Sequence, residues 1–572
     1  MVDTAMQHIL ANKTTGPKAS FSIFGLTLCV LDVFLLALMG TILLLQLHLQ
    51  SVQKINWDEF FYLSHIYEAR AGHLDDTLQM GHVYLFRWLT HITGGEMVQI
   101  TIGRVVMWAV QLATLTLIVA TARAFMSLTS ALFAGLSFLG IGFVFIHGTS
   151  FRTDPLAALC MMYAIYIFTA SELNRPDLMG LSVALALGAI VTIKVVLFAP
   201  LLAVLAIWRL RNSSDVRQKF IHFTCSAAGA VILFLTALWL HKWQLNDVQT
   251  PQNATNLTSI FETVFLSGGI FPRADIMRVG MFTGLLPTIM IFGGTLLCLW
   301  GVLKNNEDRV TYCIILAMGL PLLSFVFCRN AYPYFYAFIF PSSVLLAGYF
   351  IEKLKISSIL TAALAALMTL NICLLYLGRK TQTQFEQAQT LTAIHDIFPE
   401  PVNYFDRSSM VASFPKAGIF MSSWGLRSYL LKGESVFLRE LNNKTIPLVV
   451  DNSPVLSAAL RGEPSGLSEK DAKALRDNYI HHWGHIWVAG KEMNITLDSS
   501  DFFILIPGVY TVETEGEVLI NQQPFKAGEH VNLSRGTHKI SSVGENKITL
   551  RWGNNLIRPE YQPSEKPIFG AF

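Results

Sequence analysis

The stretch that decides the fold is SIFGLTLCVLDVFLLALMGTILLLQLH, residues 22–48, which is apolar almost throughout. A helix that crosses the hydrocarbon core of a bilayer needs about 20 such residues. The run is too long for the core of a signal peptide, and no cleavage site follows it. We therefore expect a membrane-spanning helix here. Asp32 lies about ten residues into the run, where a charge is costly, and we expect a hydrogen bond within the helix bundle to satisfy it.

Ten further apolar runs follow, and together they predict a polytopic α-helical membrane protein with about eleven transmembrane helices. They lie near residues 98–121, 128–147, 155–171, 178–193, 195–208, 221–241, 279–302, 310–328, 333–351 and 356–377. The adjacent runs at 178–193 and 195–208 are short, and one long helix is the alternative there. That alternative would move everything after residue 377 to the other side of the membrane.

The composition agrees with a membrane protein. Of 572 residues, 52% are hydrophobic and only 14% are charged, whereas soluble domains carry about 25% charged residues. This excludes a disordered chain, a secreted disulfide scaffold and an ordinary cytosolic enzyme. A net charge of +3 is too small to indicate a nucleic-acid partner. The seven cysteines lie in or beside apolar runs, and neither they nor the histidines show a metal-binding spacing.

Positive charge predicts the orientation. If the N-terminus is cytoplasmic, the short inner loops are basic, as cytoplasmic loops are expected to be. Their residues are Lys13, Lys18, Arg123, Arg175, Arg209, Arg211, Arg217, Lys219, Lys304, Arg309, Lys353 and Lys355. This arrangement requires two helices at 178–208. It places the loops 49–97 and 242–278, and the whole C-terminal region, on the outer side.

The C-terminal region reads as soluble. About half of the charged residues follow residue 377. We predict a transmembrane domain over 1–377, an α/β subdomain over 378–490 and a β-sandwich, of a kind that often binds carbohydrate, over 491–572. In the α/β part, 446–452 reads as a buried strand and 468–480 as a helix capped by Ser468. Four tryptophans could stack on a sugar but are more often core residues: Trp424, Trp483, Trp487 and Trp552.

The first outer loop carries the strongest chemical signal, NWDEFFYLSHIYEARAG at 56–72. Asp58 and Glu59 are adjacent carboxylates beside an apolar span, where acidic residues are rare. A carboxylate is a natural base for a hydroxyl or amine, although a solvated loop pair is the alternative. A second outer segment, 256–267, is amphipathic and would lie on the membrane surface or pack over the bundle.

The loop motif Asp58-Glu59-x-x-Tyr62, which ends at Glu68-Ala69-Arg70-Ala71-Gly72, resembles the first periplasmic loop of GT-C glycosyltransferases. The likeness is to the group of protein O-mannosyltransferases and aminoarabinose (lipid A) transferases. FRTDPLAAL at 151–159 and VTIKVVLFAPLLAVL at 191–205 are similar to two further motifs of that group. One motif departs from it: residues 81–87 contain no Lys-Pro-Pro, so the role of that lysine falls to His82 or Arg87.

The resemblance implies an inverting transferase of a bacterial inner membrane that uses a sugar on a polyprenyl phosphate. Asp58 would be the base and Glu59 its support. Lys194, which would otherwise snorkel to the interface, would hold the donor phosphate, where negative charge develops, with Arg152, Arg273, Arg329 or Arg87. Tyr62, His82 and Asp154 would contact substrate, Asp154 also ordering Arg152. The acceptor would be lipid A, lipopolysaccharide core or another envelope glycan on the periplasmic side.

No organic cofactor is implied, and a divalent metal held by Asp58 and Asp154 stays open. Two other functional classes remain as alternatives. A transporter or flippase of lipid-linked sugars would usually show internal repeats, and the sequence has none. A non-catalytic envelope assembly protein would give Asp58 and Lys194 no joint purpose.

Overall fold

The computed structural model describes residues 20–23, 26–74, 81–245, 269–304, 308–381, 383–495, 499–542, 546–564 and 566–569. The predicted amphipathic segment at 256–267 lies outside them. The chain forms two compact units. Unit 1 comprises Met1–Gln53, Gly72–Leu89 and Thr101–Gln382, and unit 2 comprises Lys54–Ala71, Thr90–Ile100 and Thr383–Phe572.

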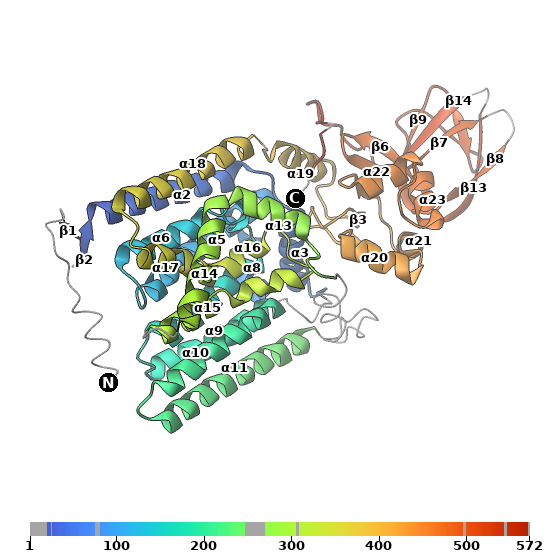
Figure 1. Cartoon of the computed structure of the whole chain (residues 1–572). Helices are drawn as coiled ribbons and strands as arrows, with labels where there is room; N and C mark the ends of the chain where they lie inside the picture. The colour runs from blue at the N-terminus through green and yellow to red at the C-terminus, as the bar shows by residue number, and fades with distance from the viewer. Residues whose placement is uncertain are drawn as a thin grey trace. The chain divides into compact units, whose positions relative to one another are not determined.

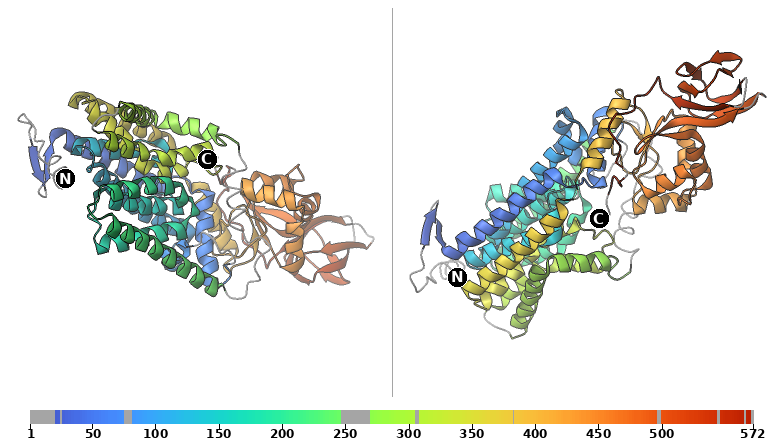
Figure 2. Two further views of the ribbon diagram at one scale, coloured as in Figure 1. Left: turned by 60° about the horizontal axis from the view of Figure 1, so that its bottom comes forward. Right: turned by 90° about the horizontal axis from the view of Figure 1, so that it is seen from above.

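Unit 1 is a bundle of helices (Figures 1 and 2) preceded by a short antiparallel hairpin. Its elements are β1 (Ser20–Ile23), β2 (Leu26–Cys29), α2 (Val30–Val52), α4 (His82–Phe86), η1 (Arg87–His91), α5 (Gly95–Ala122), α6 (Leu128–Leu139), α7 (Gly142–His147), α8 (Thr153–Ala170), α9 (Arg175–Val191), η2 (Ile193–Phe198), α10 (Ala199–Arg211), α11 (Val216–Gln244), α13 (Ala274–Thr283), α14 (Leu285–Leu303), α15 (Arg309–Ala317), η4 (Leu320–Val326), α16 (Phe335–Ser343), α17 (Leu345–Lys353) and α18 (Ser358–Arg379). The residues of η1 and α5 between Thr90 and Ile100 belong to unit 2.

Each of the eleven predicted runs contains helix, but the count of eleven spans is not confirmed. The prediction was wrong at the start of the first run, 22–48, where Leu26–Cys29 pair with Ser20–Ile23 as strands and the helix begins only at Val30. Among the described residues, eight helical segments are long and apolar enough to cross a membrane. The pair α15 and η4, bent by 44°, would make a ninth. The run 128–147 is broken at Gly140 and Ile141 into two short helices, and α9 has 17 residues. The chain is a multi-pass membrane protein.

Local signals explain where the helices begin and end. Asn174 caps α9 by accepting a hydrogen bond from the backbone of Asp177, whose carboxylate accepts one from Asn174 in return. Thr192 has an extended backbone (φ −162°) and ends α9. The stretch 178–208 is therefore two helical segments, as expected. Figure 1 shows α9, α10 and α11 side by side.

Small residues allow close helix packing inside unit 1. A Cβ on Gly294 of α14 would come within 2.2 Å of the Leu346 carbonyl oxygen of α17, and one on Gly348 within 2.5 Å of the Ser130 carbonyl oxygen of α6. Such backbone contacts are typical of helix pairs in membranes. Asp32 lies in the first turn of α2 and not, as expected, ten residues inside a span. Its carboxylate accepts the predicted bundle hydrogen bond, from the Thr129 hydroxyl at 2.5 Å.

Unit 2 combines helices with two sheets. Its elements are α3 (Trp57–Ala71), α19 (Phe385–Ile397), β3 (Tyr404–Phe405), β4 (Lys416–Ala417), α20 (Ser423–Lys432), α21 (Val436–Asn443), β5 (Leu448–Val450), α22 (Pro454–Arg461), α23 (Glu469–Asn478), β6 (Tyr479–Trp483), β7 (Ile486–Ile495), β8 (Ser500–Ile504), β9 (Gly508–Thr514), β10 (Val518–Ile520), β11 (Gln523–Phe525), β12 (His530–Leu533), β13 (Gly536–Ser542) and β14 (Asn546–Trp552). The predicted strand at 446–452 and the helix capped by Ser468 are both present.

The larger sheet runs in the order β12-β9-β14-β7-β5-β3-β4, with β6 paired to β7. Strands β4, β3 and β5 are parallel, and the other pairs are antiparallel. A second sheet, β11-β10-β13-β8, faces β12-β9-β14-β7 across a core that includes Val512, Ile540 and Leu550. The end of the chain is thus a β-sandwich. Strand β7 crosses residue 490, so the division of unit 2 at that position remains a prediction.

Three of the four tryptophans singled out in unit 2 have described side chains, and their positions agree with a role in the core. Trp483 is buried, and Trp487 and Trp552 pack against the hydrophobic core of the α/β part. Stacking on a sugar requires an exposed ring face. We therefore assign these three tryptophans to the core; the Trp424 side chain lies outside the described residues.

Candidate functional site

Asp58 and Glu59 lie in the first turn of α3, in unit 2, and both are buried. Asn56 caps the helix: its Oδ1 accepts a hydrogen bond from the Asp58 backbone N–H at 3.0 Å. The Glu59 Oε1 accepts the Asn56 backbone N–H at 3.0 Å, which is the glutamate half of a capping box. Glu59 therefore has a structural task in the cap of α3. A negative charge at this helix end is also favoured by the helix dipole.

Aromatic rings surround this turn of α3 within unit 2. Phe61 stacks on Phe420, with ring centroids 4.0 Å apart, and Trp57 lies 5.4 Å from the same ring. The guanidinium carbon of Arg407 lies 5.0 Å from the Trp57 ring centroid. The predicted substrate residue Tyr62 is half-buried, and its ring lies beside Phe61. The carboxylate pair therefore sits on a helix that is held by apolar and cation–π contacts.

Three of the predicted site residues meet in unit 1. Asp154 Oδ1 accepts a hydrogen bond from Lys194 Nζ at 2.7 Å, and its Oδ2 accepts one from Arg152 Nε at 3.2 Å. All three side chains are at least mostly buried, with Lys194 the most exposed at 12%. Asp154 thus orders Arg152, as expected, and also Lys194. Two cations share the Asp154 carboxylate, so the trio carries a net positive charge when all three are ionised.

The local backbone structure explains the threonine–lysine motif at residues 192–194. Thr192 ends α9, and its hydroxyl accepts the backbone N–H of Lys194 at 3.4 Å. This hydrogen bond caps the short helix η2, which begins at Ile193. The residue type at position 192 therefore fixes the backbone from which Lys194 extends to Asp154.

Two tyrosines connect this trio to a second pair of predicted residues. Arg152 lies over the Tyr334 ring, with its guanidinium carbon 3.5 Å from the centroid, and Lys194 Nζ is 5.1 Å from it. Tyr334 stacks with Tyr332 at 5.9 Å. Arg273 lies over the Tyr332 ring, also donates to the Tyr332 hydroxyl, and donates from Nε to the Arg329 carbonyl oxygen at 3.0 Å.

We call this set of residues the basic cluster: Arg152, Asp154, Lys194, Arg273, Arg329, Tyr332 and Tyr334. The sequence predicted its charged members, but it missed the two tyrosines. The signal that could have found them is the alternation of aromatic residues in Tyr332-Pro333-Tyr334, close after Arg329. Aromatic faces beside arginine and lysine are a favourable way to stabilise cations away from water.

The other predicted residues lie on α4 and η1 of unit 1. His82 begins α4 and is buried, whereas Arg87 begins η1 and is exposed. Phe86 packs edge-on against Phe151, with centroids 5.0 Å apart. Because these two phenylalanines directly precede Arg87 and Arg152, the α4–η1 segment borders the basic cluster.

The surroundings of Asp154 do not favour a metal ion. Each of its oxygens accepts a hydrogen bond from a cationic side chain, and the two adjacent positive charges would repel a divalent cation. Throughout the described part of the chain, no three His, Cys, Asp or Glu side chains gather as metal ligands.

Comparisons with known proteins bear on the fold. No protein-family model and no curated protein matches the sequence. Several solved structures are similar, among them the following three. ArnT from Cupriavidus metallidurans bound to undecaprenyl phosphate has a TM-score of 0.55 and 13% identity, over 76% of this chain and 95% of that chain. The same protein in the apo state has a TM-score of 0.51 and 14% identity, over 75% and 94%.

The third is the archaeal oligosaccharyltransferase AglB from Archaeoglobus fulgidus in complex with an inhibitory peptide and a dolichol-phosphate. Its TM-score is 0.51 and its identity 10%, over 91% of this chain and 96% of that chain. Both proteins are members of the GT-C superfamily. The GT-C fold expected from the sequence motifs is therefore confirmed.

Proposed function

We propose that this membrane protein is a glycosyltransferase that moves a sugar from a polyprenyl-phosphate donor to an acceptor in the cell envelope. The observation that carries the proposal is the basic cluster, because a set of arginines and a lysine of which Arg152 is buried and the others are half-buried suits a phosphate. The GT-C fold supports it, as does the binding of undecaprenyl phosphate or dolichol-phosphate by two proteins of that fold.

In the proposed reaction, an acceptor oxygen or nitrogen attacks the anomeric carbon of the sugar. The new glycosidic bond forms as the bond from that carbon to the phosphate oxygen breaks, which inverts the configuration. Asp58 takes the acceptor proton, and the lipid phosphate leaves with the bonding electrons. Arg152, Lys194 and Arg273 of unit 1 stabilise the negative charge that develops on the phosphate.

The proposal places the reaction on the periplasmic side of a bacterial inner membrane, with the N-terminus cytoplasmic. The acceptor would be lipid A, lipopolysaccharide core or another envelope glycan. The basic inner loops support this orientation.

The test is incubation of the purified full-length protein with a panel of polyprenyl phosphates that carry labelled sugars, each offered with lipid A and core acceptors. We expect transfer of label from one donor, with or without a chelator. Failure to bind or to use any donor in the panel would contradict the proposal. Loss of turnover only with the chelator would instead establish a metal requirement.

A transporter of lipid-linked sugars is the second candidate, and one observation favours it. The segment formed by α15 and η4 is bent by 44°, which makes it a broken span or a re-entrant segment, and broken helices are common in transporters. Reconstitution in vesicles with a fluorescent lipid-linked sugar separates the two candidates, because a transporter moves the intact donor without cleaving its sugar.

A further inference from the structure

Helix α19 of unit 2 is hydrogen-bonded to the chain just before α3. Gln387 is fully buried, and its Oε1 accepts the Ile55 backbone N–H at 2.8 Å. Its Nε2 donates to the Ile55 carbonyl oxygen, also at 2.8 Å. One side chain thus satisfies both backbone polar groups of a buried residue. Asp58 follows three residues later.

The same helix holds a segment from the end of the sequence, which we call the strap and define as residues 561–564 and 566–569. Gln389 uses both ends of its amide: Nε2 donates to the Gln562 carbonyl oxygen at 2.9 Å, and Oε1 accepts the Ser564 backbone N–H at 2.9 Å. The Tyr561 ring packs edge-on against Trp483 at 5.1 Å. His485 Nε2 lies 3.0 Å from the Lys566 carbonyl oxygen.

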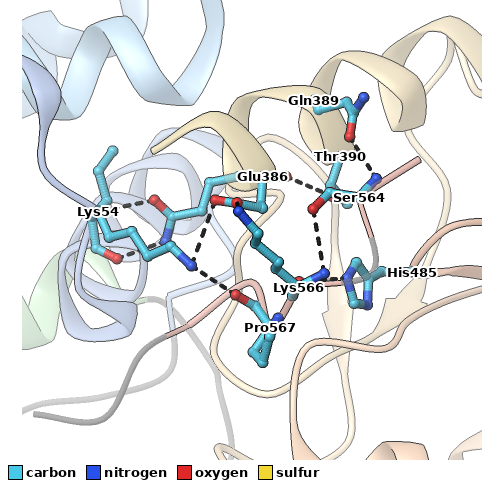
Figure 3. A network of polar contacts seen from close by, with 10 residues as sticks. Lys54, Glu386, Gln389, Thr390, His485, Ser564, Lys566 and Pro567 are labelled. Atoms are coloured by element: carbon cyan, nitrogen blue, oxygen red, sulfur yellow. Dashed lines mark hydrogen bonds and ion pairs between the residues drawn. The ribbon is translucent and has the colours of Figure 1, made fainter. Parts of the chain in front are cut away.

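The strap also reaches the chain that leads into α3, as Figure 3 shows. Lys54 Nζ donates to the Pro567 carbonyl oxygen at 2.8 Å and lies 3.6 Å from the buried Glu386 carboxylate. Beyond Pro567, Ile568 and Phe569 are buried, and the Phe569 ring lies edge-on to Phe60 of α3 at 6.0 Å. The strap therefore contacts the chain on both sides of Asp58 in sequence, at Lys54 before α3 and at Phe60 within α3.

Charged side chains also meet where the strap contacts the chain before α3. Glu386 is 8% exposed, and Lys54 is 23% exposed. Lys566 lies 4.0 Å from the other Glu386 oxygen but is 79% exposed, so solvent screens it. Lys54 is consequently the main cationic partner of Glu386. The second acceptor for the Lys54 ammonium group is the Pro567 carbonyl oxygen of the strap.

We propose that the strap, held on α19 by Gln389, is a positioning element that fixes the start of α3 and thereby aims Asp58 at the acceptor. The catalytic part of this inference rests on the proposed function. Displacement of a catalytic group by 1 Å can lower turnover by about 10²-fold. A helix that is held at Phe60, and whose preceding residues Lys54 and Ile55 are also held, resists such displacement.

The experiment uses the full-length protein with Gln389→Ala, which removes both hydrogen bonds to the strap, and with residues 561–572 deleted. Gln523→Ala is the matched control, because Gln523 is exposed on β11 of the sandwich. Two quantities are measured: backbone hydrogen exchange of peptides covering 54–62, and kcat and KM for donor and acceptor. A synthetic peptide of residues 557–572 is then added to the truncated protein.

We expect faster exchange at 54–62 in both strap variants, protection restored by the peptide, and a fall in kcat of about 10- to 100-fold with the donor KM unchanged. Unchanged exchange at 54–62 would overturn the inference, whatever the protein's activity. Faster exchange with unchanged kcat would overturn the positioning role. If the parent protein transfers no sugar, the proposed function fails, and exchange with peptide rescue still decides whether the strap holds α3.

Discussion

At the scale of single residues, Asp58 and Glu59 are neighbours with different surroundings. Glu59 closes the capping box of α3 through Asn56. Successive residues on a helix point about 100° apart, so the two carboxylates cannot share one line of approach to an acceptor. The structure thus supplies a structural role for Glu59, whereas the role of Asp58 as the base stays a prediction.

We predict that Asp58→Asn lowers turnover by about 10²–10⁴-fold, because a well-placed general base contributes that much. Donor binding should survive, since cations and not this carboxylate hold the phosphate. Glu59→Gln should be mild, because glutamine also completes a capping box. Turnover and donor affinity are measured after each variant elutes like the parent protein in detergent. Normal turnover in a folded Asp58→Asn protein would move the base to another carboxylate.

Lys194 allows a second prediction at this scale. Lys194→Ala should weaken donor binding as well as turnover, because one cation of the basic cluster is lost. It also leaves Asp154 with Arg152, and breaking a buried ion pair commonly costs about 3–5 kcal/mol. The double variant Lys194→Ala with Asp154→Asn is therefore the informative control, since it removes the unpaired charge. If the double variant binds donor like the parent protein, Lys194 is a structural residue only.

At the scale of elements, α19 is joined to the start of α5 by a polar contact within unit 2. His395 Nε2 lies 3.0 Å from Glu96 Oε2, and the Ser413 hydroxyl donates to Glu96 Oε1 at 2.7 Å. The hydrogen bond to Glu96 raises the pKa of His395 above its ordinary value. The charged imidazolium is therefore more stable in the folded chain than in the unfolded chain.

This contact predicts a dependence of stability on pH. A raised pKa contributes stability fully below the ordinary histidine pKa of about 6.5, and that stability is lost as the pH rises through the folded-state value. The Tm of the protein should fall between pH 6 and pH 8 more steeply than that of His395→Gln. His530→Gln, on the exposed edge of β12, is the control and should follow the parent protein. If the Tm of His395→Gln and that of the parent protein changed with pH in parallel, His395 would not be a source of the pH dependence.

The elements differ in how far sequence could predict them. Apolar runs located every helical span, because an apolar stretch in a bilayer has few options besides a helix. The breaks at Gly140 and between Ala317 and Leu320 were missed, since composition does not change there. Asp154 and Lys194 were both chosen, yet their ion pair joins residues 40 apart in sequence. The strap was not predicted, because its contact with Lys54 spans 513 residues, and only the folded chain brings such positions together.

The pairing of strand β7 determines which residues can be deleted to remove the β-sandwich. It pairs with β5 and β6 through residues up to Ala489 and with β14 from Gly490 onward. A cut at residue 490 would halve this strand and would also remove the strap. We predict that replacing 499–552 by a short flexible linker leaves donor binding measurable, because the proposed phosphate residues all belong to unit 1. Complete loss of donor binding in a folded variant of this kind would contradict the modular interpretation.

At the scale of the whole molecule, orientation depends on whether the number of crossings is even or odd. Eight crossings would put both ends of the chain on one side, whereas nine or eleven would put them on opposite sides. The eight clear spans therefore do not by themselves give the proposed orientation. It requires an odd number of the three further candidates to cross the membrane: the bent pair α15 and η4, the pair α6 and α7, and α9.

The last prediction tests this parity directly. A reporter that is active only in the periplasm should be active after Glu400, in the exposed turn that follows α19, and inactive after Ser213, between α10 and α11. The basic residues Arg209, Arg211 and Arg217 near the second position are the physical reason, because positive loops are retained in the cytoplasm. A cytoplasmic reporter at the same two positions should give the opposite result. Periplasmic activity at both positions would mean that the segments between them cross an even number of times. Activity at Ser213 alone would invert the protein and place Asp58 on the cytoplasmic side.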